Sequence, residues 1–134
     1  MIVTLVSCTD YEQKIIKDIK SETINYDKLI KTINNCDLSR FKYNQYISKE
    51  YFPKKLVEVI DNTVLKDKVR YIIIDKEPDC DSLTIEIISG RLHVRYEPCP
   101  GPDFPSPDSY EEVGLIETWG VNKNWIIWKD NDYI

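Results

Sequence analysis

The sequence is poor in the residues on which many catalytic and metal sites depend. It has only four glycines, and none falls in a GxGxxG or Walker pattern, so no glycine-rich loop for a nucleotide phosphate is present. His93 is the only histidine, which excludes a metal site built from several imidazoles. The four cysteines form no CxxC pair of the kind that binds zinc. We therefore expect no cofactor and no metal.

Long apolar runs are also missing. No stretch approaches the roughly 18 apolar residues that a membrane helix needs. Residues 1–7 are apolar, but they have no basic region and are too short for a signal peptide. The segment Leu5-Val6-Ser7-Cys8 imitates a lipoprotein cleavage box, which we interpret as a chance match. We expect a cytoplasmic protein that does not contact membranes.

What the sequence does contain is typical of one folded domain. The chain has 134 residues, of which 42% are hydrophobic and 31% charged. The net charge of −5 is unevenly placed, because residues 1–75 carry +2 and residues 76–134 carry −7. Such a chain is repelled by nucleic acid, so we expect no direct nucleic-acid contact. The acidic half indicates either a basic protein partner or a surface that only keeps the chain in solution.

The first half predicts mainly helices. Residues 2–7 read as a short buried strand, followed by a capping box from Thr9 to Glu12. Apolar side chains at helical spacing then predict three helices, and the stretch 37–52 predicts a short helix and an aromatic-rich connection. The expected core residues of the three helices are Tyr11, Ile15, Ile16 and Ile19; Tyr26, Leu29, Ile30 and Ile33; and Leu56, Val57, Ile60 and Val64.

The second half predicts strands. Residues 69–75 are predicted to form a strand. Residues 82–88 and 91–97 are predicted to form a hairpin around Ser89-Gly90 that pairs Ile87 with Leu92. Five prolines make residues 98–114 a loop. Residues 115–121 and 125–129 form a second hairpin that pairs Trp119 with Ile127 and Glu117 with Lys129.

Helices followed by strands predict an α+β fold in a single domain, residues 1–134. We expect an N-terminal strand and three or four helices packed on a mostly antiparallel sheet of about five or six strands.

The sequence offers two candidate catalytic sites, and for each of them a purely structural role is more common. Cys8, expected at a helix N-terminus, resembles the reactive thiols of redox enzymes and phosphatases, but no resolving cysteine or phosphate-binding arginine follows it. Glu86 is predicted opposite His93, a pair able to exchange protons, although a surface ion pair is the commoner use. We therefore expect no enzymatic activity.

Cys80 and Cys99 become cross-strand neighbours if the first hairpin's register continues to them. Pro78 and Pro98 argue that the pairing ends earlier, and a reducing cytoplasm favours free thiols. We expect free thiols and leave the disulfide as the alternative.

The C-terminal segment combines acids with aromatic residues, the composition of tight protein interfaces steered by charge. The alternative is that the tryptophans belong to the core. Trp119 and Trp125 are predicted to share one sheet face with Ile127, and Trp128 the other, so we expect one or two of the three to be buried. The candidate partner-binding residues are Asp103, Phe104, Asp108, Tyr110, Glu111, Glu112, Glu117, Trp128, Asp130 and Asp132.

A small acidic α+β chain, rich in Ile, Asn and Lys and ending in a tryptophan-bearing hairpin, resembles the bacterial immunity proteins of contact-dependent growth inhibition and related polymorphic toxin systems. The resemblance concerns overall character and rests on no signature motif, so it assigns no residue. It implies a cytoplasmic protein that binds and neutralises a cognate toxin, often a nuclease with a basic active-site cleft.

The expected mechanism is occlusion of that cleft by the acidic loop and hairpin of residues 103–132. Two alternatives stay open. One is a phage or mobile-element inhibitor of a host defence nuclease, and the other is a small thiol-dependent enzyme that uses Cys8.

Overall fold

The computed structural model describes residues 3–37, 39 and 41–132, and for residues 3–10 it describes the backbone alone. Three α-helices are α1 (Val3–Ser21), α2 (Thr23–Asn34) and α3 (Lys54–Asp61), and Lys49–Tyr51 form a single 3₁₀ turn. Seven strands form one sheet. They are β1 (Tyr46–Ser48), β2 (Tyr71–Lys76), β3 (Leu83–Ser89), β4 (Leu92–Tyr96), β5 (Tyr110–Val113), β6 (Ile116–Gly120) and β7 (Trp125–Asp130).

The sheet is antiparallel throughout the described chain, in the order β1-β2-β3-β4-β7-β6-β5. The α+β class is therefore confirmed. The sheet has more strands than the expected five or six, because β1 lies in the aromatic-rich connection and β5 at the end of the proline loop. Both additional strands are sheet edges.

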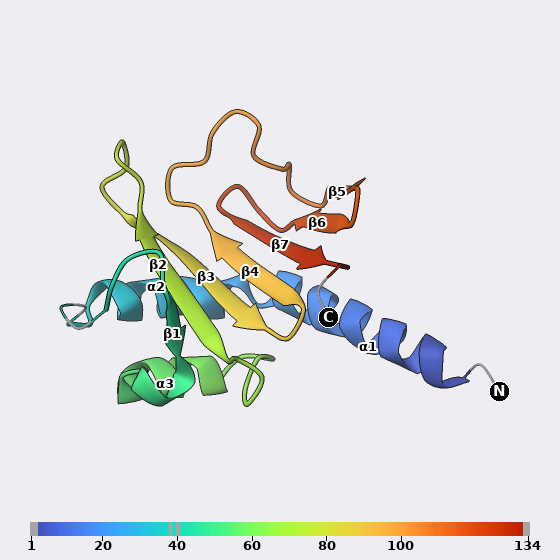
Figure 1. Cartoon of the computed structure of the whole chain (residues 1–134), viewed down its shortest axis with the longest axis horizontal. Helices are drawn as coiled ribbons and strands as arrows, with labels where there is room; N and C mark the ends of the chain where they lie inside the picture. The colour runs from blue at the N-terminus through green and yellow to red at the C-terminus, as the bar shows by residue number, and fades with distance from the viewer. Residues whose placement is uncertain (1–2, 38, 40, 133–134) are drawn as a thin grey trace.

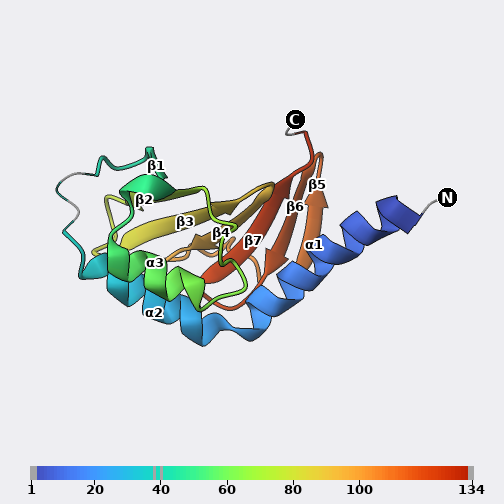
Figure 2. The ribbon, with the colours of Figure 1, turned by 90° about the horizontal axis from the view of Figure 1, so that it is seen from below.

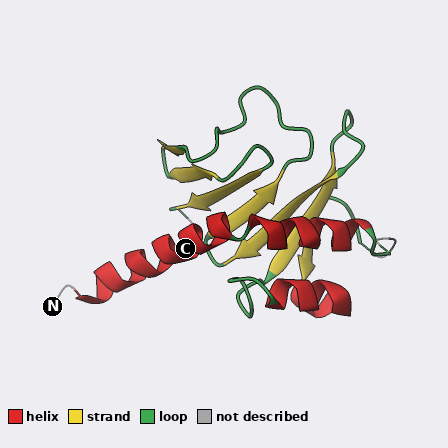
Figure 3. Ribbon diagram, turned by 180° about the vertical axis from the view of Figure 1, so that it is seen from behind, coloured by secondary structure: helices red, strands yellow, loops and turns green. Residues whose placement is uncertain are grey.

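All three helices lie on one face of the sheet (Figures 2 and 3). Figure 2 shows α1 passing beneath the β5–β7 half, while α2 and α3 cover the half that begins at β1. The other face, which we call the open face, is turned toward the viewer in Figure 1, and no helix of the described chain covers it. No described helix combines the length and the apolar character that crossing a membrane requires.

The core lies between the helices and the sheet. The helices contribute most of the apolar residues that their spacing predicts, such as Ile15, Ile16 and Ile19 from α1, while the sheet contributes alternate residues of β2, β3, β4 and β7. Trp125 of β7 is buried among them and packs against Tyr26 of α2, with 5.5 Å between ring centroids. The predicted helix faces have exceptions. Tyr11 is 55% exposed, Val57 is only half-buried and does not join the core, and Val64 lies beyond the end of α3.

The predicted N-terminal strand and the Thr9–Glu12 capping box are wrong. The chain is helical from Val3 onward, so α1 begins before the residues that were expected to form its cap. A short apolar run does not distinguish a buried strand from a helix by its pattern alone, and here the backbone is helical through the described part of the run. Ile2 lies outside the described residues.

The register of the β6–β7 hairpin is confirmed, since Trp119 pairs with Ile127 and Glu117 with Lys129. The β3–β4 hairpin is shifted by two residues from the prediction. Ile87 pairs with Val94 and Ser89 with Leu92, so the turn consists of Gly90 and Arg91. Gly90 takes a φ of +59°, which glycine adopts without steric cost in a two-residue turn. A shift of two keeps every side chain on its predicted face.

Candidate functional site

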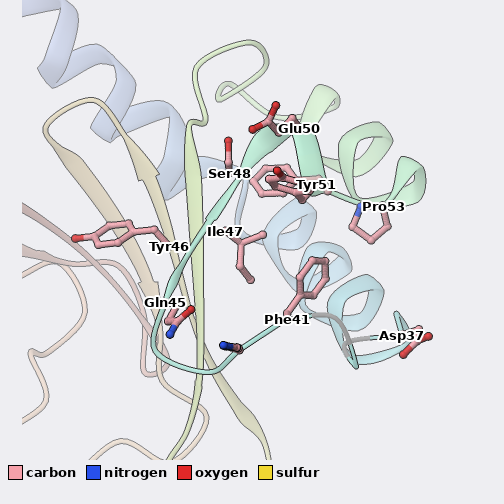
Figure 4. Close-up of a pocket in the computed structure, with 11 residues that line it drawn as sticks. Asp37, Phe41, Gln45, Tyr46, Ile47, Ser48, Glu50, Tyr51 and Pro53 are labelled. Carbon is pink, nitrogen blue, oxygen red and sulfur yellow. The ribbon is translucent and has the colours of Figure 1, made fainter.

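A groove runs along the outer side of β1 and has a volume of about 770 Å³ (Figure 4). We call it the edge groove. Its walls include the rings of Phe41, Tyr46 and Tyr51, and Ile47 and Pro53 complete its apolar part. Figure 4 shows the Tyr46 ring pointing away from Phe41 and Tyr51, toward the other side of β1.

The backbone of β1 leaves polar groups on this side. The amide of Lys49 bonds to the carbonyl of Arg70 at 3.1 Å, so the alternation of an antiparallel pair turns the backbone groups of Tyr46 and Ser48 away from β2. An unpaired edge of this kind is where an added strand pairs.

A second hollow, of about 640 Å³, lies on the open face, and we call it the open-face hollow. Residues from the first four strands, from β7 and from the β3–β4 turn line it. They are Tyr46, Arg70, Tyr71, Ile88, Gly90, Arg91, His93, Trp128 and Asp130. Tyr46 and Tyr71 meet edge-on with 5.5 Å between ring centroids, and His93 stacks on Trp128 at 3.7 Å.

Beside this hollow, a carboxylate is buried on the open face. Glu86 is only 7% exposed. Its Oε1 accepts a 2.6 Å hydrogen bond from the indole nitrogen of Trp128 and lies 3.4 Å from Nδ1 of His93. Its Oε2 lies 3.8 Å from the guanidinium of Arg95, which also binds Glu97 at 2.7 Å. The predicted contact of Glu86 with His93 therefore exists, but as a diagonal, because Glu86 is registered opposite Arg95.

The surroundings of Glu86 keep it ionised. Burial by itself raises the pKa of this carboxyl, but the nearby imidazole of His93, the hydrogen bond from Trp128 and the charge of Arg95 outweigh burial and lower the pKa below its ordinary value of 4.5. A carboxylate with a lowered pKa and engaged oxygens is a weak base near neutral pH. The cluster is therefore better suited to holding β3, β4 and β7 together than to proton transfer.

Among the predicted partner-binding residues, those of β5 and its neighbour β6 come together. Each of the four residues of β5 is exposed, and no described strand pairs with its outer side. The hydroxyl of Tyr110 donates a 2.7 Å hydrogen bond to Glu117, which raises the pKa of Tyr110 to about 12. We call Tyr110, Glu111, Glu112, Val113 and Leu115 the acidic edge. Val113 and Leu115 are more than half exposed there.

Glu117 links the acidic edge to α1. It accepts a 2.8 Å hydrogen bond from Asn131 and lies 3.6 Å from the ammonium of Lys129, which in turn lies 3.2 Å from Glu12. The hydrogen bonds from Asn131 and Tyr110, and then the charge of Lys129, lower the pKa of Glu117 below its ordinary value. Glu117 is thus a structural group of this edge and is less available to a partner than Glu111 and Glu112.

The other predicted residues are dispersed. Asp103 and Phe104 lie in the proline loop, and Asp108 at its end approaches Lys20 of α1 at 3.8 Å. Trp128 and Asp130 line the open-face hollow on the other side of the sheet from Glu117 and Lys129. Asp132 is exposed just after β7. The ten residues therefore do not form one surface.

The bonding of Cys80 and Cys99 and the position of Cys8 both differ from the predictions made from the sequence. Cys80 and Cys99 form a disulfide with 6.0 Å between their Cα atoms, so the prediction of free thiols is wrong for this pair. The bridge joins the β2–β3 connection to the start of the proline loop, where the prolines had been expected to separate the two segments. Cys8 lies inside α1, five residues after the helix begins, so its predicted place at a helix N-terminus is also wrong. The Cys8 side chain lies outside the described residues.

Sequence reasoning missed the edge groove and both guanidiniums of the open-face hollow. The density of tyrosines at 43, 46 and 51 was the available signal, and the structure shows that these three and Tyr71 are exposed. The spacing of the first three gave no period, so they were assigned to a connection, whereas Tyr71 was assigned to a strand. Among the described residues, no three His, Cys, Asp or Glu side chains are grouped to hold a metal ion. Comparison of the chain with protein-family models, curated proteins and solved structures finds no match in any of the three.

Proposed function

We propose that this chain is an immunity protein that neutralises a cognate toxin by covering a basic surface of that toxin, most simply the active-site cleft of a nuclease. The observation that carries the proposal is the acidic edge. It presents an unpaired strand whose four residues are all exposed, two of them glutamates.

The chemistry of this edge favours a basic protein partner. No ion pair of the described chain involves Glu111 or Glu112, and exposed apolar surface of Val113 and Leu115 lies beside them. Carboxylates of this kind speed the capture of a basic partner, while the apolar side chains and the free strand edge supply contacts once the two have met. Within residues 103–132, we therefore propose the β5 side of the sheet as the surface that binds the toxin.

The test uses the product of the neighbouring open reading frame, co-expressed with this chain. We expect Glu111→Gln with Glu112→Gln to weaken protection of the cells and to slow association about tenfold, with a smaller dependence on salt. The matched control is Glu58→Gln with Asp79→Asn, which removes the same charge from exposed positions on α3 and the β2–β3 connection.

Equal protection by both double variants would remove the acidic edge from the interface. If the neighbouring gene belongs to a phage or a mobile element, the same edge serves the alternative function, inhibition of a host defence nuclease. In that case the double variant loses inhibition of the nuclease instead of protection from a toxin.

A further inference from the structure

We propose that the open-face hollow binds a nucleoside monophosphate, with the base against its aromatic wall, the phosphate on Arg70 and Arg91, and the ribose beside Asp130. This site is separate from the acidic edge and does not depend on the proposed immunity function. Its volume of about 640 Å³ lies within the range of small-molecule sites.

The aromatic wall follows one line across the sheet. The strand registers place Tyr71, Ile88, His93 and Trp128 side by side on β2, β3, β4 and β7. Ile88 is buried in the floor, whereas 39% of Tyr71 is exposed. The ring of Tyr46 meets Tyr71 edge-on and extends the wall toward β1. The exposed rings of this wall are those of Tyr46 and Tyr71, which are 67% and 39% exposed. A base can stack on such rings, and stacking tolerates any base.

The cationic part of the hollow consists of two guanidiniums. Arg70 and Arg91 are both exposed, and no ion pair of the described chain involves either of them. A 2.8 Å hydrogen bond to Asn131 holds Arg91, which leaves most of its five N–H donors for a ligand. A guanidinium fork matches phosphate oxygens, and a phosphate monoester carries close to two negative charges at neutral pH. Two arginines therefore complement a phosphate better than a carboxylate, which has one charge.

Asp130 gives the hollow an acceptor. One of its oxygens accepts the amide of Asp132 at 2.9 Å, and the carboxylate keeps further acceptor capacity. A carboxylate repels an anion but accepts hydrogen bonds from hydroxyls, which is how acidic residues bind the ribose of dinucleotides. An aromatic amino acid at a peptide C-terminus offers a ring and an anion but no such hydroxyls. The combination of aromatic wall, guanidiniums and carboxylate thus fits a nucleotide better than a peptide.

The test is to titrate the isolated chain with AMP and to measure binding by calorimetry and by the fluorescence of Trp128. Trp119 and Trp125 are buried, so Trp128 is the tryptophan that the ligand quenches. We expect saturable binding of AMP, at least tenfold weaker binding of adenosine or inorganic phosphate, and at least a tenfold loss with Arg91→Gln. Lys123→Gln is the matched control, because Lys123 is exposed at the opposite end of β7. We expect it to leave AMP affinity unchanged.

Several outcomes would overturn the site. The first is no binding of AMP by the unmutated, normally folded chain. The second is an affinity for adenosine or for phosphate equal to that for AMP. The third is an equal loss of AMP affinity in Arg91→Gln and Lys123→Gln. Tighter binding of N-acetyl-tryptophan than of AMP would assign the hollow to a peptide C-terminus instead. The partner is absent from these titrations, so a failure here leaves the immunity proposal untouched, and the converse also holds.

Discussion

Glu86 combines a charge with burial on the face of the sheet that no described helix covers. Its carboxylate is stabilised by a hydrogen bond from Trp128 and by the charges near it, so a group that alone would be costly to bury is compensated on both oxygens. Trp128 carries out two tasks in this arrangement, because its nitrogen binds Glu86 and its ring stacks on His93. A single side chain thus connects the buried cluster to the wall of the open-face hollow.

The lowered pKa of Glu86 predicts how stability depends on pH. Because the folded pKa lies below the unfolded value near 4.5, the carboxylate stabilises the fold fully above that value. Its contribution disappears as the pH falls through the folded pKa, and Glu117 acts in the same direction. Urea unfolding at pH 7 should show Glu86→Gln to be less stable than the parent chain by about 1–3 kcal/mol.

The difference between the two proteins should shrink as the pH falls below 4.5. Glu111→Gln, at an exposed position on β5, serves as the control and should follow the parent chain at every pH. A loss for Glu86→Gln that is the same at pH 7 and pH 3 would contradict the ionic role of this residue.

At the same scale, alternation along a strand predicted the sides of the tryptophans correctly. Trp119 and Trp125 are buried beside Ile127, and Trp128 lies on the opposite face. The burial of Glu86 is an exception to this alternation, and it could not be predicted from the sequence. Glu86 sits at a position that reads as a polar surface residue, and its burial depends on Trp128, which is 42 residues away in the chain.

The elements were predicted wherever a local pattern is strong. The stripe of α2 and the register of β6 with β7 follow from spacing and turn length alone. The beginning of α1 was not predicted, because a short, mostly apolar run is compatible with a strand or a helix. The strands β1 and β5 form only by adding to an existing edge, which local pattern does not reveal. The acidic edge and the open-face hollow depend on this strand order.

The last part of the proline loop packs directly against the end of β6. A Cβ atom added at Gly120 would collide with the backbone carbonyl oxygen of Ser106, whereas one added at Gly101 meets only open space. We expect Gly120→Ala to destabilise the protein by about 1–3 kcal/mol through overpacking. Gly101→Ala should change stability by less than about 0.5 kcal/mol.

Thermal or urea unfolding of the two glycine variants measures this difference. Two variants of equal stability would mean that the loop moves away from Gly120 at no cost. The contact between the loop and β6 would then contribute little to the position of β5.

The whole molecule is a sheet with helices on one side and two free edges. The edge groove lies along β1 and the acidic edge along β5, at opposite ends of the strand order, with the open-face hollow between them. A partner bound along β5 and a small ligand in the open-face hollow therefore contact different strands for the most part. Their binding is expected to be independent unless the partner also covers Asp130.

The disulfide between Cys80 and Cys99 predicts a dependence on reductant. Closing a loop with a sequence separation of 19 stabilises the fold by about 3 kcal/mol, through loss of freedom in the unfolded chain. Cys80→Ser with Cys99→Ser should lower the free energy of unfolding by that amount in guanidinium titrations, and dithiothreitol should do the same to the parent chain. Cys36→Ser, at a half-buried free cysteine, is the control.

Identical unfolding curves with and without dithiothreitol would show that the bridge does not form in solution. The result also bears on location. Disulfides persist in oxidising compartments and are rare in a reducing cytoplasm. A chain that needs the bridge for stability would argue against the cytoplasmic location expected from the sequence.

The same bridge has a covalent consequence. The disulfide between Cys80 and Cys99 closes a covalent ring of main chain that contains β3, β4 and their turn. The hairpin that lines the open-face hollow therefore belongs to this ring. A protease that cuts once inside this ring opens it without dividing the molecule, and both pieces remain attached through sulfur. A nick at the Gly90-Arg91 turn would therefore be invisible on a non-reducing gel and would separate the chain into two fragments only when the sulfurs are reduced.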